Sequence, residues 1–385
     1  MANIKITALT ELTIAADTAI VPVVDIAGGT VTKKITAANL KSYMVDYPPT
    51  NQFYIDPKRT DTYTATGNPN KPFKTISSCY TYIKSLITAG TISSAETNPV
   101  FMILCGSITE NITLDTGHIY LIGNNSGIHA PIYINGNITI NGTASGAGAI
   151  DANHFSLSGL AISGTAQSAA IRSTGSNPQR VFMKDLWLFA SGIQTGTTPF
   201  TNAGGYGFYQ DNTGSGTITS GDQIKISHTG TGDVYCIDII NGSASFSEVE
   251  TSGATQVGAV QNGATLTFTT SELDANGEVC LESYGTGRLV VSDSIISNAR
   301  TGVDSHGIWL HAAGGAALIT NTIIDVASST SGSRMIKGVA GTGVFYKNIM
   351  IGKATTFPFA DHNKTIDAAV AVAAALITTD TFTTV

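Results

Sequence analysis

The chain contains little charge and few aromatic residues. Only 12% of its 385 residues are Asp, Glu, Lys or Arg, and 8% are aromatic, whereas about 25% of an average globular protein is charged. The net charge is −7, and the Lys and Arg residues are scattered, which excludes a basic surface for nucleic acid. Neutral Ser, Thr, Asn and Gly must therefore solvate most of the surface, as suits regular β-strands.

The sequence also lacks the patterns of exported, membrane-spanning and cofactor-binding chains. The first residues run into an alternating Thr-rich stretch without a signal-peptide pattern, so export is not expected. The longest apolar run, residues 368–377, is half of the roughly 20 residues that span a bilayer, so no membrane insertion is expected. No His or Cys spacing indicates a metal site, and we expect no metal and no cofactor.

Cysteine is scarce, and its four copies are far apart. There is no Cys-x-x-Cys pair, and three of the four lie among apolar, strand-like neighbours, as in Phe101-Met102-Ile103-Leu104-Cys105. This pattern favours buried free thiols over disulfides or metal ligands. The four residues are Cys79, Cys105, Cys236 and Cys280.

What the chain does contain, beyond residue 127, is repeats. Five segments each place two apolar stretches around one small residue, and the segments 246–250 and 268–272 fit the same register. Between aligned positions the spacings are 26, 22, 21, 28 and 27 residues. A period in the twenties predicts one coil of a right-handed parallel β-helix per repeat. The central residues are Gly159, Asp185, Asp293, Asn321 and Asn348.

The repeats predict how such a body is stabilised. One coil cannot bury its apolar positions alone, but coils stacked at about 4.8 Å form a continuous core and pair most backbone groups. Gly, Asp and Asn tolerate a bend between strands, so we interpret the central residues as structural rather than catalytic. The residues expected in the core include Phe155, Leu157, Leu289, Val291, Ile319 and Ile323.

The segment before the repeats carries a family resemblance. A stretch with helical spacing runs from Ile76 to Ile87, and Gly90 ends it. It follows the segments Tyr54-Ile55-Asp56-Pro57 and Pro72-Phe73-Lys74-Thr75-Ile76 and precedes the segment from Gly106 to Leu114. This order resembles the entry to pectate-lyase-like right-handed β-helices over residues 53–127. The resemblance implies an all-β solenoid with a capping helix, and it implies little about activity.

The first 48 residues follow a different pattern. Residues 20–25 predict a strand and residues 36–43 a short helix with Thr36 as a possible N-cap, before Pro48-Pro49 breaks the chain. Four short segments resemble the leader of many tailed-phage structural proteins: Leu9-Thr10, Val21 to Asp25, Thr32 to Thr36 and Asn39-Leu40. That resemblance implies docking onto a virion, although a small module without a particular role is the alternative.

Together these patterns divide the chain into four parts. We expect a virion-attachment module at 1–48, a linker with capping helix at 49–99, the β-helix body at 100–355, and a C-terminal cap or trimerisation segment at 356–385. The last part contains an Ala-rich stretch that suits a helix or intersubunit strands, and residues 378–385 look strand-like. A homotrimer is implied by the phage resemblance and by the need to cover the open strand edges of the last coil.

Two pairs of residues are candidates for catalysis. Glycosidases use two carboxylates about 5 Å or about 6.5–9.5 Å apart, and aligning residues 246–250 with 268–272 places Glu250 one coil from Glu272. Asp304 and His306 share a face of a strand and suit an acid–base pair. The competing interpretations are solvated outward carboxylates and a local Asp–His hydrogen bond. No metal or cofactor residues are predicted.

One aromatic segment also suggests a glycan contact. Tyr206, Phe208 and Tyr209 follow a glycine-rich stretch that lacks the Lys-Ser/Thr of a phosphate loop. If exposed, these rings would stack on sugars. Burial is the equally consistent alternative.

The functional prediction is a virion structural appendage without catalysis, of the tail spike, tail fibre or decorating fibre type. It would assemble in the host cytoplasm, join other virion proteins through its N-terminal module, and contribute to adhesion to host-surface polysaccharide. The alternative is a polysaccharide depolymerase, either glycosidase or lyase, on the same fold. A third class, a cellular pectin-acting enzyme or adhesin, fits the sequence less well.

Overall fold

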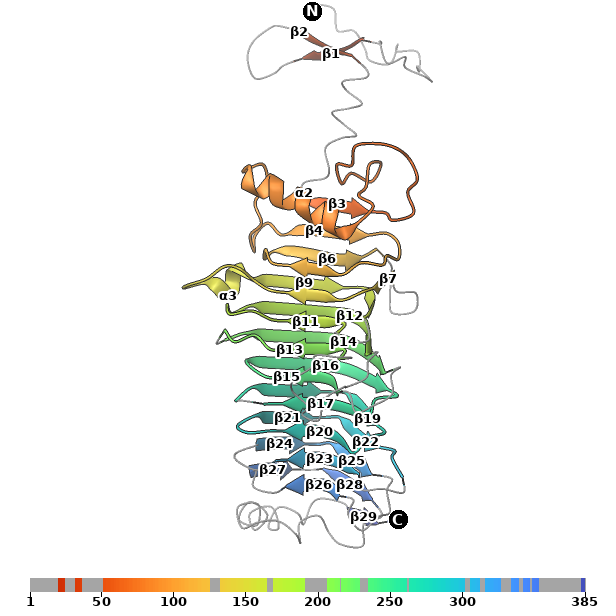
Figure 1. The fold of residues 1–385 in the computed structure, drawn as a ribbon, viewed down its shortest axis with the longest axis vertical. Helices are drawn as coiled ribbons and strands as arrows, with labels where there is room; N and C mark the ends of the chain where they lie inside the picture. The colour runs from red at the N-terminus through yellow and green to blue at the C-terminus, as the bar shows by residue number, and fades with distance from the viewer. Residues whose placement is uncertain are drawn as a thin grey trace, which may run out of the picture.

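The computed structural model describes most of the chain between residues 51 and 352, with gaps. The described residues are 20–24, 32–36, 51–124, 132–164, 169–190, 206–214, 216–228, 235–261, 263–301, 305–311, 316–326, 334–338, 342–346, 348–352 and 382–384. Those from residue 51 to residue 352 form an elongated rod of stacked coils (Figure 1). The fold is all-β with a parallel β-helix, as the repeats predict.

Two parallel sheets run along the rod. Every strand pairing described within them is parallel, and a coil of the repeat region contributes one long bent strand or two shorter strands to the first sheet and one strand to the second. The first sheet contains β3 (Gln52–Ile55), β4 (Val100–Leu104), β6 (Ile119–Gly123), β7 (Ile132–Asn135), β9 (His154–Ser158), β10 (Leu160–Ser163), β12 (Arg180–Ala190), β14 (Ile218–His228), β16 (Ser243–Ser252), β18 (Thr265–Thr269), β19 (Glu272–Ala275), β21 (Arg288–Ser292), β22 (Ile295–Asn298), β24 (Ala316–Thr320), β25 (Ile323–Val326), β27 (Thr342–Tyr346), β28 (Ile349–Gly352) and β29 (Phe382–Thr384).

The second sheet closes the other side of each coil. It contains β5 (Ile112–Leu114), β8 (Ile138–Ile140), β11 (Ile171–Ser173), β13 (Phe208–Gln210), β15 (Tyr235–Ile239), β17 (Gln256–Val260), β20 (Val279–Ser283), β23 (His306–Leu310) and β26 (Arg334–Gly338). A short helix, α3 (Ala149–Ala152), precedes β9. Separately, β1 (Ile20–Val24) and β2 (Thr32–Thr36) pair antiparallel.

The small residues of the repeats make a bend in the first sheet, within the long strand β12 at Asp185 and between two shorter strands at Asp293 and Asn321. Asp185, Asp293 and Asn321 have φ of 52°, 53° and 49°, the left-handed region that Asp and Asn tolerate better than most residues. Their structural role is confirmed. In addition, Asn321 Nδ2 donates a hydrogen bond to Asp293 Oδ1 one coil away, at 2.5 Å.

The same bend is made by residues that the repeat pattern does not single out. Gln223, Glu248 and Thr270 have φ of 56°, 53° and 50° and occupy the equivalent position in their coils. Stacking of the flanking strands, rather than the intrinsic preference of these three residues, therefore fixes the left-handed conformation.

Two spacings of the sequence alignment were wrong. Glu272 pairs with Ile295, and Thr270 rather than Glu272 occupies the bend position of Asp293, so that coil has 23 residues instead of 21. Thr322, not Asn321, aligns with Asn348. Asn348 is only 1% exposed. Its Nδ2 donates to the Ile319 carbonyl and its Oδ1 accepts from the Thr322 backbone N–H, both at 2.9 Å, so its role is structural but not at the bend.

The core fills the space between the sheets. Phe155, Leu157, Leu289, Val291 and Ile319 are fully buried as predicted. Ile323 was placed wrongly: in β25 the inward residues are Ile324 and Val326, and Ile323 faces outward. Because side chains alternate along a strand, the one-residue error moved this side chain to the opposite face.

The cysteines are free thiols, and three of the four are buried. Cys79, Cys236 and Cys280 lie in the core, where burial raises their thiol pKa values, so they stay protonated and unreactive. Cys105 contradicts the prediction of burial: it is exposed, directly after β4.

A helix covers the N-terminal end of the core, as predicted. Helix α2 (Ile76–Thr88) begins at the N-cap Thr75, and Gly90 follows its last turn with φ of 70°. The inner face of the helix packs on the first coils through four buried residues, Ile76, Cys79, Tyr80 and Ile83. No described helix is long and apolar enough to cross a membrane.

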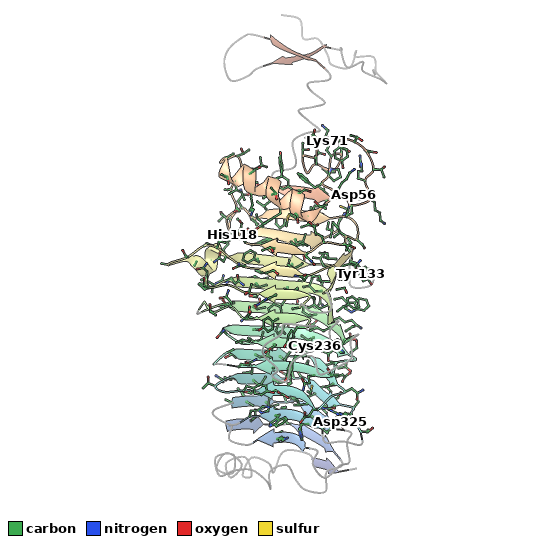
Figure 2. The ribbon with its side chains drawn as sticks, viewed as in Figure 1. Asp56, Lys71, His118, Tyr133, Cys236 and Asp325 are labelled. Atoms are coloured by element: carbon green, nitrogen blue, oxygen red, sulfur yellow. The ribbon has the colours of Figure 1, made fainter. Side chains whose placement is uncertain are left out.

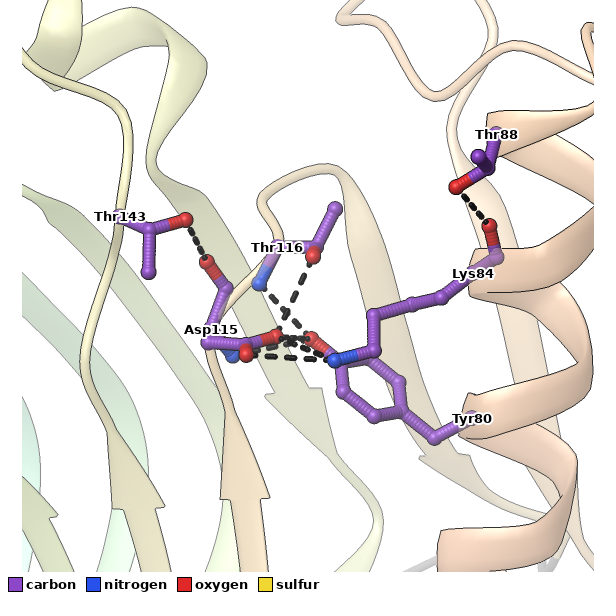
Figure 3. A network of polar contacts seen from close by, with 6 residues as sticks. All are labelled: Tyr80, Lys84, Thr88, Asp115, Thr116 and Thr143. Carbon is purple, nitrogen blue, oxygen red and sulfur yellow. Dashed lines mark hydrogen bonds and ion pairs between the residues drawn. The ribbon is translucent and has the colours of Figure 1, made fainter.

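A polar network joins this helix to the first coils (Figure 3). Tyr80 Oη donates to Asp115 Oδ1 at 2.8 Å and accepts from the backbone N–H groups of Asp115 and Thr116 at 2.9 and 2.7 Å. Lys84 Nζ lies 3.2 Å from the same carboxylate. The hydroxyl of Tyr80 thus satisfies backbone donors at the turn after β5, which would otherwise lack partners.

A second carboxylate accepts hydrogen bonds from the start of the helix. Glu110 Oε2 accepts from the Ile76 N–H and Oε1 from the Ser77 N–H, both at 2.9 Å. These N–H groups have no partner inside the helix, and the helix dipole favours a negative charge there. Glu110 belongs to the motif that resembles the β-helix entry.

Replacing Glu110 by Ala is therefore expected to lower the free energy of unfolding by about 1–2 kcal/mol. Chemical denaturation followed by circular dichroism measures the change. Glu278→Ala, which removes an exposed carboxylate from another coil, is the matched control and should shift stability by less than about 0.5 kcal/mol. Equal effects of the two substitutions would contradict the capping role.

Parts of the expected organisation lie outside the described residues. Of the short helix expected at 36–43, Thr36 ends strand β2 and residues 37–43 are not described. Residues 368–377 of the C-terminal part are likewise outside, whereas β29 pairs with β28 in the first sheet. The domain boundaries at 48, 99 and 355 remain predictions.

Candidate functional site

Glu250 and Glu272 lie next to each other on the outward face of the first sheet. Glu250 of β16 pairs in register with Glu272 of β19, so they are one coil, about 4.8 Å, apart along the rod. Both are exposed. Glu250 Oε1 lies 2.8 Å from Lys225 Nζ, on the coil before.

This arrangement provides the separation of a retaining glycosidase pair but not its surroundings. A general acid needs an apolar, enclosed position to keep its proton near neutral pH, whereas the Glu250 side chain is 54% exposed and already forms an ion pair. The pair therefore lies on an exposed, solvated surface.

The second predicted pair is described in part. His306 is 1% exposed on β23, its Nε2 lies 3.2 Å from Lys337 Nζ, and its ring meets Trp309 edge-on at 5.5 Å. Asp304 lies outside the described residues, so the proposed Asp–His contact stays a prediction. His306 is held in a packed, aromatic setting.

The tyrosine-rich segment at the start of β13 is buried. Tyr206, Phe208 and Tyr209 are 2%, 0% and 5% exposed. Phe208 belongs to the main core, and the two tyrosines pack with Tyr235 and Ala259 on the outer side of the second sheet. Of the two alternatives for these rings, the structure shows burial, and they do not form an exposed sugar platform.

Sequence reasoning missed a buried acidic cluster at the same place. Asp238 and Glu282 are 0% and 2% exposed and stand in one column of the second sheet with Ala259 between them. Gln261 Nε2 donates to Asp238 Oδ1 at 3.1 Å, and Tyr235 Oη donates to Glu282 Oε2 at 3.0 Å. Loss of solvent contact, and secondarily the charge of Glu282, raises the pKa of Asp238 to about 7.

The cluster has the residue types of a catalytic centre but is enclosed. His311 Nε2 lies 3.4 Å from Glu282 Oε2 and its ring stacks between Tyr284 and Trp309, at 4.0 and 4.1 Å. Both carboxylates are almost without solvent contact, so the arrangement leaves no open space for a substrate beside them. A single acidic residue within each otherwise mostly apolar strand, Asp238 in β15 and Glu282 in β20, is the sequence signal that marks it.

A second missed feature is exposed. Tyr133 of β7, Trp187 and Phe189 of β12 face outward, and we call these three residues the aromatic platform. The Phe189 ring lies 4.9 Å from Trp187 and 6.2 Å from Tyr133, with interplanar angles of 26° and 30°. Tyr133 is 36% exposed and lies on the outside of the rod (Figure 2).

The platform rests on a small residue and is held by hydrogen bonds. Ala161 lies between Tyr133 and Trp187 in the same column of outward positions and is fully buried beneath the rings. Trp187 Nε1 donates to Ser227 Oγ at 2.9 Å, and Ser227 Oγ lies 3.1 Å from Ser252 Oγ. Period-two alternation with the inward residues Leu186 and Leu188 marks Trp187 and Phe189 as outward in the sequence. Nothing in the sequence brings Tyr133 beside them.

One pocket lies beside the network of Figure 3. It has a volume of about 330 Å³ and is lined by residues that include Glu96, Asp115, His118 and Asp151. Asp115 is already bound by Lys84, and Asp151 lies 3.3 Å from Arg180. Burial lowers the pKa of His118. Among the described residues, no group of three His, Cys, Asp or Glu side chains is placed to hold a metal ion.

The class that the structure defines is thus a parallel β-helix with a helical N-terminal cap. No protein-family model matches the chain, and no curated protein matches its sequence. Among solved structures it is similar to the pectin methylesterase PemA from Erwinia chrysanthemi, at 14% sequence identity and a TM-score of 0.34, over 68% of this chain and 89% of that one. At this level the likeness concerns the fold alone.

Proposed function

We propose that this protein is a bacteriophage virion appendage, of the tail spike, tail fibre or decorating fibre type, that acts as a homotrimer and contributes to adhesion to the host surface. One observation carries the proposal. A separately patterned leader, which resembles those of tailed-phage structural proteins, precedes an elongated rod of coils stacked from β3 to β28. Such a rod holds a binding surface at a distance from its attachment point.

The rod suits this role physically. Its coils pair their backbone groups with neighbours along the described stack, which resists local unfolding. Its surface is solvated mainly by neutral Ser, Thr and Asn side chains, because only 12% of the residues are charged. The leader would join other virion proteins, and the body would face host-surface polysaccharide.

Removing residues 1–48 tests the attachment role. The remaining chain contains the whole described stack and its capping helix, so we expect it to fold and trimerise but to be absent from purified particles. Particle composition, measured by mass spectrometry after complementation of a phage that lacks the gene, is the readout. The full chain supplied in the same way is the control. Normal incorporation of the shortened chain would show that the leader is not the dock.

A further inference from the structure

The aromatic platform has the geometry of a ligand-binding surface. Large aromatic rings are normally buried, because each contributes a large apolar area to the core. Here Tyr133 is 36% exposed, and Trp187 and Phe189 are half-buried on outward positions. The angles between the planes of neighbouring rings are 26° and 30°, so the rings are close to parallel.

We propose that the platform is a glycan-binding site that takes the apolar face of a neutral pyranose ring in host-surface polysaccharide; this rests on the proposed role in adhesion. A pyranose presents C–H groups on one face and hydroxyl groups around its edge. Flat aromatic rings bind the C–H face, and polar groups at the rim fix the orientation through the hydroxyls.

The polar rim is present on the next coils. Lys225 Nζ lies 5.7 Å from the centre of the Trp187 ring and 2.8 Å from Glu250 Oε1. Ser227 and Ser252 continue the column of Phe189 along the rod. These groups provide an ammonium donor, a carboxylate acceptor and two hydroxyls beside the rings, which is a complement to sugar hydroxyls.

The platform is also preorganised. Its residues stand on strands rather than on loops, and the Trp187 indole is fixed by Ser227, which contacts Ser252 in turn. Binding would therefore immobilise few side chains, and the entropic cost of association would be small. A flexible exposed aromatic would lack this advantage.

The charges beside the platform favour a neutral sugar. At and after the bend, the strands β14, β16 and β19 carry one lysine, which Glu250 neutralises, and four carboxylates, Glu248, Glu250, Glu272 and Asp274, whereas Asp222 lies before the bend and is paired with Lys184. A glycan rich in uronate or phosphate would meet like charge there, and repulsion would weaken its binding.

The test uses the full chain and a panel of soluble polysaccharides: a glucan, a galactan and a mannan as neutral probes, and polygalacturonate as the acidic probe. Affinity electrophoresis measures binding. We expect retardation by at least one neutral probe and none by polygalacturonate. Trp187→Ala should weaken binding roughly tenfold or more.

Phe182→Ala is the matched control. Phe182 is also an exposed aromatic of β12, at 40% exposure, but lies before the bend at Asp185, away from the platform. Its loss should leave binding within about twofold. Trp187→Phe keeps a ring and guards against misfolding of the alanine variant, and it should retain part of the affinity. Circular dichroism checks the fold of each.

Several outcomes would overturn the inference: no binding of any neutral probe, binding that survives Trp187→Ala, or equal loss with Phe182→Ala. Measuring the chain length of the probe polysaccharides after incubation gives a further outcome that would overturn it. Shortening by the wild type but not by a Glu250→Gln, Glu272→Gln double variant would replace simple binding with depolymerisation. If the protein is found in particles but binds no glycan, this inference fails alone; if it is absent from particles, the proposed function fails whatever the binding result.

Discussion

Replacing Ile324 by Asp is expected to leave no soluble folded protein. Ile324 is fully buried and pairs in backbone register with Ile296 of one neighbouring coil and with Met350 of the other. An unpaired carboxylate there would cost at least several kcal/mol, which is comparable with the whole stability of a typical domain. The defect would also interrupt a stack in which each coil depends on its neighbours.

Ile323→Asp is the matched control. The side chain of Ile323 is on the opposite face of the same strand and is half-buried. The variant should therefore be soluble and give the circular dichroism spectrum of the wild type. The measurement is the soluble fraction after expression, followed by a thermal melt. Soluble, folded Ile324→Asp protein together with insoluble Ile323→Asp protein would reverse the inward register of β25.

Asp238→Asn is expected to stabilise the protein above neutral pH. Burial raises the pKa of Asp238 from 3.8 to about 7, so between these values the folded chain keeps a proton that the unfolded chain releases. The free energy of unfolding contributed by this group therefore falls as pH rises from about 4 to about 7. Because a tenfold change in proton affinity between the folded and unfolded chain corresponds to about 1.4 kcal/mol, the loss is on the order of a few kcal/mol.

An asparagine at this position keeps an acceptor for Gln261 and carries no charge to desolvate. We expect Asp238→Asn to flatten the decline in stability between pH 4 and pH 7 and to melt at a higher temperature than the wild type at pH 8. Asp325→Asn, at an outward position of β25, is the control and should leave the decline unchanged. A wild-type stability that rises across this range would falsify the assignment of the decline to Asp238.

Local patterns predicted the architecture because each of them acts within one coil. The helical spacing from Ile76 to Ile87 fixed the capping helix, and the Asp and Asn residues of the repeats marked the bends at Asp185, Asp293 and Asn321. A residue that tolerates a left-handed backbone shows its role in the sequence. Thr270 and Gln223 do not, because their neighbours impose the same bend on them.

The sequence by itself thus determined the β-helix, its cap and most of its core, since apolar alternation and turn chemistry are local properties. Only the tertiary structure decided the exact stacking of coils. The alignments of Asn348 and Ile323 were one residue off, and a one-residue slip reverses the face of a side chain. The buried pair Asp238 and Glu282 and the platform formed by Tyr133, Trp187 and Phe189 depend on coil lengths that loops of unequal size set. Residues far apart in sequence meet there through stacking, which no local pattern encodes.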